Sequence, residues 1–234
     1  MDRHIEAFLE MMAAERGASR NTVAAYLSDL TDFSTFTAGR GGFASNADAT
    51  TAQAYMASLF AIGLAPRTAA RRLSTLRQFH LFLLRENVRA DDPTTLLDAP
   101  RLPRSLPKYL SEAEVDSLLA AAAVHPGRQG KLLHAALEIL YATGLRITEL
   151  LSLPRHALAS DAEILLVRGK GGKERIVPLS SQARQAAAAL TTMAAEALPK
   201  PVGPHLFPGR TPRHPITRQA FAVLLKRVAE AAGL

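Results

Sequence analysis

Residues 142–150, which read ATGLRITEL, interrupt a helical pattern with a glycine that is followed two residues later by an arginine. Gly144 ends one helical segment, and a short second segment resumes after the break. Arg146 therefore lies between two helices, inside an otherwise apolar stretch. An arginine in this position is either a structural clamp paired with Glu149 or a bidentate phosphate ligand. The local sequence leaves both interpretations open.

Two β-rich runs follow this break and flank a glycine-rich turn. The runs cover residues 164–167 and 175–179, and the turn between them reads RGKGGKE over residues 168–174. It is not a P-loop, because that motif lies between a strand and a helix and has Ser or Thr after its lysine. The pattern predicts a β-hairpin with lysines at its tip. Such a lysine either gives a proton or a charge to a phosphate oxygen or is simply solvated.

Helical signals surround this hairpin in the second half of the chain. Ser111 and Glu114 form a capping box that begins a helix. The predicted helices of this half cover residues 112–123, 131–142, 181–198 and 221–232. Residues 111–234 are therefore expected to form an α+β domain with one small β-hairpin.

The first half of the chain is predicted to be entirely helical. Apolar residues recur at helical spacing, and Ser19 and Thr68 are predicted to cap the second and fourth of four helices. Residues 1–92 are expected to form a compact all-α domain. The segment 93–110 that follows is rich in proline and basic residues, which favours an extended linker. That linker either lies along a phosphate backbone or is a plain surface tether.

The composition excludes several classes of protein. The sequence has 234 residues and no cysteine, which excludes disulfides, thiol catalysis and zinc–thiolate sites. No apolar run is long enough for a membrane span, and the acidic residues near the start do not fit a signal peptide. The chain is therefore expected to be cytoplasmic.

Positive charge is concentrated in the second half. Residues 1–99 have 10 arginines, no lysine and 11 acidic residues, for a net charge of −1, whereas residues 100–234 have 18 basic and 10 acidic residues, for a net charge of +8. One predicted helix of the first half is nevertheless rich in arginine: Arg67, Arg71, Arg72, Arg77, Arg85 and Arg89. This distribution favours a polyanionic partner, although a solvated helix face would have the same composition.

Taken in order, these motifs resemble the tyrosine recombinases of the phage integrase family. The helix break at 142–150 and the lysine hairpin carry the resemblance in the second half. Residues 102–111, which read LPRSLPKYLS, look like the interdomain linker of the bacterial Xer recombinases. Residues 85–93 look closer to the XerD subfamily than to XerC, and residues 19–30 resemble the start of the family's DNA-binding domain. The resemblance covers essentially the whole chain.

The resemblance implies a fold and a reaction. Residues 1–92 would be a four-helix core-binding domain, and residues 111–234 a catalytic domain. The reaction would be site-specific DNA recombination through a 3′-phosphotyrosyl intermediate, with charge on the phosphate stabilised electrostatically. By motif position Arg146 would be a catalytic arginine and Lys170 the general acid. No metal or nucleotide cofactor is implied.

The local concentration of basic residues and the resemblance together suggest DNA contacts, and the resemblance also implies partners. The DNA-binding residues would be Arg71, Arg72, Arg77, Arg104, Lys108, Lys173, Arg175 and Arg218. The partners would be a double-stranded recombination site, a second, XerC-like subunit in a tetrameric synapse, and a DNA translocase as regulator. The expected role is the resolution of chromosome dimers.

The nucleophilic tyrosine of the family has no counterpart at the expected place. The four tyrosines, Tyr26, Tyr55, Tyr109 and Tyr141, all precede Arg146. The chain is therefore expected to lack a C-terminal segment and to be inactive alone. The alternatives are a phage, integron or transposon integrase of the same family, a DNA-binding module without catalysis, and a helical scaffold whose charge is incidental.

Overall fold

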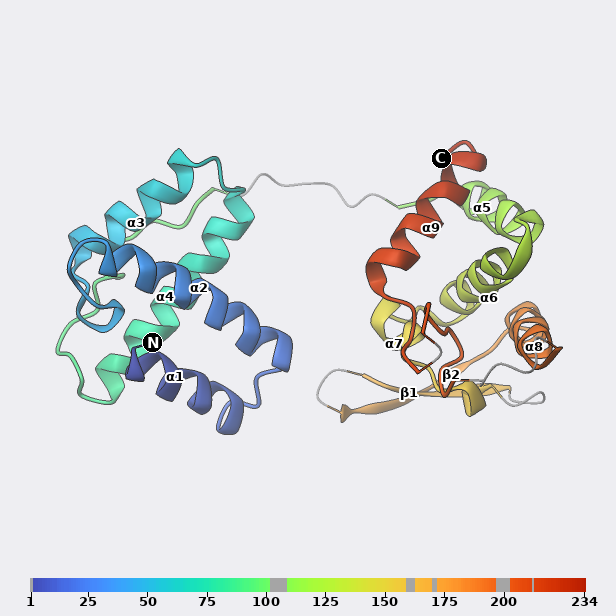
Figure 1. Ribbon diagram of the computed structural model, residues 1–234, viewed down its shortest axis with the longest axis horizontal. Coiled ribbons are helices and arrows are strands. Elements are labelled where there is room, and N and C mark those ends of the chain that lie inside the picture. Colours follow the sequence, from blue (N-terminus) through green and yellow to red (C-terminus); the bar gives the residue numbers. More distant parts are fainter. Residues whose placement is uncertain (1, 102–108, 159–162, 170–171, 197–202, 212) are drawn as a thin grey trace. The chain divides into compact units, whose positions relative to one another are not determined.

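The computed structural model describes residues 2–101, 109–158, 163–169, 172–196, 203–211 and 213–234 (Figure 1). The chain divides into two compact units, Met1–Leu106 and Pro107–Leu234. The described residues are mainly helical, with one small antiparallel sheet, which confirms the predicted fold class. The finer division into residues 1–92, 93–110 and 111–234 stays a prediction.

The N-terminal unit consists of helices, and the first three α-helices begin with a side-chain N-cap. Its elements are α1 (Arg3–Ala14), α2 (Arg20–Ala38), the 3₁₀ helix η1 (Ala44–Asn46), α3 (Ala49–Ala61) and α4 (Pro66–Arg85). The Ser19 side chain accepts a hydrogen bond from the Thr22 amide, as expected for an N-cap. Helix α4 begins at Pro66, because the fixed φ of proline suits the first helical position. Thr68 therefore lies in the first turn and is not the cap that the sequence predicted.

The core of this unit joins all four α-helices. Phe8 of α1 contacts the rings of Tyr26, Phe79 and Phe82, and Phe33 of α2 lies edge-on to Tyr55 of α3. These rings come from segments far apart in sequence, so their burial fixes the arrangement of the helices.

The C-terminal unit is built around one central helix. Its helices are α5 (Glu112–Val124), α6 (Gly127–Thr143), α7 (Ile147–Leu151), the 3₁₀ helix η2 (Arg155–Ala157), α8 (Ser181–Glu196) and α9 (Arg218–Ala231). Helix α6 contacts α5, α7, α8 and α9, and its Leu133 and Ile139 are fully buried in the core of the unit. Helix α6 starts at Gly127, a full turn before the predicted residue 131.

The predicted β-hairpin is present. Strands β1 (Ile164–Arg168) and β2 (Glu174–Pro178) pair antiparallel, and Arg168 is opposite Glu174 at the last pair before the turn. Leu165 and Val167 are buried in the core, whereas Leu166 and Ile176 on the opposite face are exposed. The hairpin therefore rests on the helices by one face and presents apolar side chains on the other.

Candidate active site and nucleic-acid interface

The helix break at residues 142–150 places Arg146 at the start of α7. Gly144 ends α6 with a left-handed backbone (φ 60°), a conformation that glycine adopts without strain. The chain then turns, and Arg146 becomes the N-cap residue of α7. The break therefore directs the Arg146 side chain from a helix start instead of from the middle of a continuous helix.

Glu149 is the buried centre of this site. Its Oε2 accepts a hydrogen bond from the Arg146 amide at 2.9 Å, and its Oε1 accepts one from Arg146 Nη1 at 3.0 Å. These hydrogen bonds, together with those from Arg175, lower the pKa of Glu149 to about 2, with the Arg175 side chain as the largest cause. Glu149 is therefore ionised at neutral pH.

Arg175 reaches the same carboxylate from β2. Its Nη2 donates to Glu149 Oε2 at 2.8 Å and its Nη1 donates to Oε1 at 3.2 Å, a bidentate arrangement. Gly169 borders this pair: a Cβ added there would lie 3.2 Å from Arg175 Nη1 and 3.4 Å from Glu149 Oε1. A side chain at position 169 would therefore press against both members of the pair.

Arg146 remains open to solvent although it pairs with Glu149. Its side chain is 70% exposed, whereas that of Glu149 is 7% exposed. Within the described residues its Nε and Nη2 make no hydrogen bond. The two interpretations of Arg146 are therefore compatible: the carboxylate holds one side of the guanidinium, and the other side can face a ligand.

The lysine turn lies next to this cluster in sequence. The Gly169 amide donates to the Lys173 carbonyl at 2.7 Å and closes the turn, and Lys173 is exposed. Lys170, the expected general acid, lies outside the described residues. The structure thus brings Arg146 and Arg175 together on the Glu149 carboxylate, next to Gly169 at the start of the turn.

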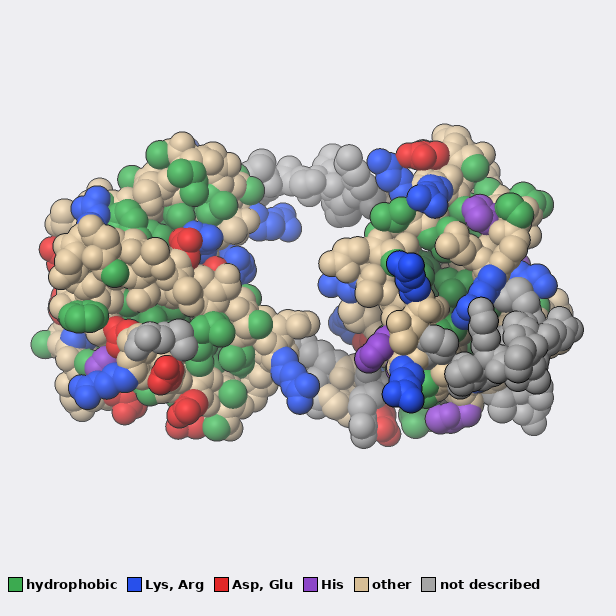
Figure 2. All heavy atoms as spheres, viewed as in Figure 1, with side chains coloured by type: hydrophobic (Ala, Val, Ile, Leu, Met, Phe, Trp, Pro, Cys, Tyr) green, Lys and Arg blue, Asp and Glu red, His purple; other side chains and the backbone are tan. Residues whose placement is uncertain are grey.

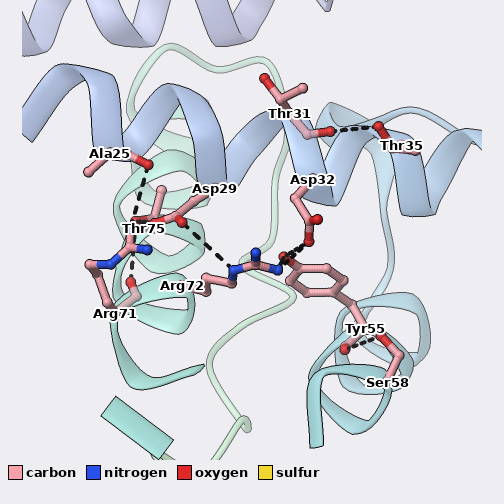
Figure 3. Close-up of polar contacts among 10 residues, drawn as sticks. All are labelled: Ala25, Asp29, Thr31, Asp32, Thr35, Tyr55, Ser58, Arg71, Arg72 and Thr75. Atoms are coloured by element: carbon pink, nitrogen blue, oxygen red, sulfur yellow. Dashed lines mark hydrogen bonds and ion pairs between the residues drawn. The ribbon is translucent and has the colours of Figure 1, made fainter. Parts of the chain in front are cut away.

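The arginines of α4 are engaged within the N-terminal unit (Figure 3). Arg72 forms an ion pair with Asp32, and its Nη1 is 3.1 Å from the Tyr55 hydroxyl. Arg71 pairs with Asp29, whose Oδ2 also accepts a hydrogen bond from Thr75 at 2.8 Å. The Arg72 side chain is only 17% exposed, against 45% for Arg71. Arg71 is thus the more accessible of the two predicted DNA contacts.

The other predicted DNA contacts are dispersed. Arg77 donates to the Leu97 carbonyl, which ties α4 to the segment after it. Arg218 is exposed at the start of α9, whereas Arg104 and Lys108 lie outside the described residues. On the face in Figure 2, basic side chains occur on both units, and most of the acidic ones lie on the N-terminal unit.

The tyrosines occupy varied environments. Tyr55 is buried, and its hydroxyl donates to Asp32 at 2.7 Å. Burial and the neighbouring Asp32 carboxylate raise the pKa of its hydroxyl, which opposes formation of the phenolate. Tyr109 and Tyr141 are exposed.

The described residues show neither a metal-binding cluster nor a membrane-spanning helix. No cluster of three or more His, Cys, Asp or Glu that could hold a metal ion occurs among them. None of the helices in the described segments is long and apolar enough to cross a membrane.

Both units match known sequence families. Residues 108–234 match the phage integrase family, and residues 5–87 match the phage integrase N-terminal SAM-like domain. Together these matches cover most of the chain in the predicted order. The chain belongs to the phage integrase family, whose members are the tyrosine recombinases.

Within this family, the chain is similar to recombinases of the XerD subfamily. The chain is 47% identical to the tyrosine recombinase XerD of Caulobacter vibrioides over 231 residues, which is 98% of this chain and 76% of the relative. It is 44% identical to XerD of Rhizobium meliloti over 239 residues, or 99% and 76% of the two chains. The predicted likeness to the XerD subfamily, and with it the enzyme class of site-specific tyrosine recombinase, is confirmed.

Solved structures share the fold at low sequence identity. A lambda integrase (75–356) dimer bound to a COC′ core site gives a TM-score of 0.70 at 18% identity, with 100% of this chain and 82% of that chain covered. The XerH recombinase bound to its difH substrate gives 0.71 at 18% identity, with 98% and 69% covered. These likenesses concern the fold.

Proposed function

We propose that the protein cleaves and rejoins DNA at a specific duplex site, with Arg146 as a phosphate ligand and Lys170 as the general acid. The observation that carries this proposal is the Arg146 side chain, which is held by the buried Glu149 and is 70% exposed. A planar guanidinium fixed on one side can donate two hydrogen bonds to a phosphate from the other. Membership of the recombinase family supports the same role.

The proposed reaction needs only proton transfer and charge stabilisation. A tyrosine hydroxyl gives up its proton to solvent and its oxygen attacks the phosphorus. The bond from phosphorus to the 5′ oxygen breaks, and that oxygen takes a proton from the Lys170 ammonium group. Arg146 stabilises the charge that develops on the non-bridging oxygens. Rejoining is the reverse: the 5′ hydroxyl attacks the 3′-phosphotyrosyl bond and returns its proton.

The partners of the protein are proposals as well. The structural neighbours include complexes of recombinases with DNA, one of them a lambda integrase tetramer on a Holliday junction. A double-stranded recombination site and further recombinase subunits are therefore proposed. From the resemblance to XerD we propose two further partners, an XerC-like subunit and a regulatory translocase. The proposed role is the resolution of chromosome dimers in the cytoplasm. The proposed phosphate contacts are Arg71, Arg218 and Lys173.

The experiment that tests the function uses a nicked suicide substrate that traps the covalent intermediate. The natural full-length protein should form a denaturation-resistant adduct with DNA, and the variant Arg146→Ala should not. Duplex binding that is equal in both proteins would show that the variant is folded. A wild-type protein that binds duplex DNA and never forms an adduct would favour the alternative, a DNA-binding module without catalysis.

Lys170 requires a substrate that reports on proton donation. A bridging sulfur in place of the 5′ oxygen is a better leaving group and needs no proton. The variant Lys170→Ala should therefore be strongly slowed on the oxygen substrate and much less on the sulfur substrate. Equal defects on both substrates would contradict the general-acid role.

A further inference from the structure

Arg175 was predicted to contact the DNA backbone, but its contacts indicate another role. Both of its terminal nitrogens donate to Glu149, at 3.2 and 2.8 Å. The fork that would bind a phosphate is therefore already occupied by a buried carboxylate. Glu149 in turn raises the pKa of Arg175, so the guanidinium stays charged.

We propose that Arg175 is a positioning residue: it fixes the end of the β-hairpin, at Arg168 and Glu174, against Glu149, and this anchoring supports the action of Lys170 as general acid. The proposal rests on the proposed function, because it assigns to Arg175 an effect on Lys170. It adds a long-range contact, 26 residues apart in sequence, to the local pair of Arg146 and Glu149.

The location of Arg175 in the hairpin supports this role. Arg175 is opposite Val167, one pair before the end of the ladder at Arg168 and Glu174. Leu165 and Val167 already anchor β1 through their buried side chains. The Arg175 pair is thus a polar anchor on the other strand, close to the turn that begins at Gly169.

Arg146 keeps its own hold on Glu149 without Arg175. Its amide and its Nη1 contact the carboxylate from only three residues away, at 2.9 and 3.0 Å. Loss of the Arg175 fork therefore releases the hairpin and leaves the local pair in place. The expected defect falls on the step that needs the lysine turn, which is protonation of the leaving oxygen.

The first test variant is Arg175→Lys, which keeps the charge and loses the fork. We expect cleavage of the oxygen substrate to be slower by about 10- to 100-fold, the scale for misplacing a catalytic group by about 1 Å. On the sulfur substrate the rate should stay close to that of the wild type. DNA affinity should not change, because the charge is kept.

A matched control is Arg184→Lys. Arg184 of α8 also pairs with a glutamate next to the hairpin, since its Nη1 lies 3.8 Å from Glu163 Oε1, but at the end away from the turn. This variant should cleave both substrates at the wild-type rate. If Arg175→Lys melts below the assay temperature, Gly169→Ala replaces it, because its Cβ would lie 3.2 Å from Arg175 Nη1 and press against the same fork.

The outcomes separate the two proposals. A selective loss on the oxygen substrate in Arg175→Lys supports the positioning role. Equal losses on both substrates, or wild-type rates on both, overturn it, provided that Lys170→Ala shows the sulfur rescue. Failure of that rescue in Lys170→Ala itself overturns the general-acid assignment instead.

Discussion

Arg72 and Arg146 are both paired with carboxylates, yet the two pairs differ in which partner is covered. In the N-terminal unit the arginine itself is largely covered, with 17% of its side chain exposed. In the C-terminal unit the carboxylate of Glu149 is covered and Arg146 is 70% exposed. The first arrangement holds helices together, whereas the second presents a charge. The exposure of the arginine, and not the presence of the pair, distinguishes scaffold from site.

The strongest test of this contrast is to remove the buried carboxylate of the N-terminal unit. Asp29 is 2% exposed and serves Arg71, Thr75 and Arg72. Asp29→Ala should destabilise the unit by about 3 kcal/mol, because breaking a buried pair leaves charge uncompensated. Hydrogen exchange of the α2 and α4 amides measures this loss separately from the other unit. The exposed Glu10→Ala serves as the control, and equal exchange in the two variants would refute a scaffold role.

The second test addresses the exposed arginine. Arg146→Lys keeps the charge and loses the fork, so cleavage should fall about 10²- to 10³-fold, the scale for one transition-state donor. The melting temperature should change little, since most of the Arg146 side chain is in solvent. A suicide-substrate time course with the natural full-length protein measures the rate. A variant that cleaves at the wild-type rate and has a lower melting temperature would show that Arg146 has a structural role, like Arg72.

The third test uses the pH dependence of the N-terminal unit. Burial lowers the pKa of His80 from 6.5 to about 4, and Arg89 acts in the same direction. The unfolded chain thus takes up this proton first as the pH falls. The contribution of neutral His80 to the free energy of unfolding is fully present above pH 6.5. It decreases by about 3 kcal/mol as the pH falls to 4. Urea titrations at several pH values should show this loss, and His80→Leu should flatten it. An unchanged slope in the variant would assign the loss to other groups.

The smallest expected effect concerns salt. Each phosphate contact contributes about −0.9 to the slope of log affinity against log salt. Arg71→Ala should make the slope shallower by up to about 0.9 if Arg71 contacts phosphate, and Arg72→Lys should leave it unchanged because Arg72 is covered. Fluorescence anisotropy at several salt concentrations measures both. A larger change in Arg72→Lys than in Arg71→Ala would reverse the comparison.

Local signals in the sequence predicted the site only in part. The pair of Arg146 and Glu149 could be predicted because its partners are three residues apart around a helix start, a spacing that the sequence shows directly. The caps at Ser19 and Ser111 were predictable for the same reason. Contacts within a few residues depend little on the tertiary fold.

Contacts between distant segments could not be predicted from the sequence. Arg175 meets Glu149 across 26 residues, and Arg72 meets Asp32 across 40. Nothing in the local pattern distinguishes these arginines from solvated ones, because their partners are determined by the packing of separate elements. Charge composition alone therefore does not show that Arg72 is largely covered and Arg71 is not.

The two-faced hairpin has a consequence for the behaviour of the protein in solution. Within the described residues its two strands pair only with each other, so each leaves an edge unpaired, and Leu166 and Ile176 on the outer face are exposed. Exposed apolar strands with open edges are templates for intermolecular β-pairing. The charged residues Glu163 and Lys173 flank the strands as gatekeepers against this association. Substitutions that remove the charge of Glu163, which is not among the proposed DNA contacts, are expected to lower solubility before they alter catalysis.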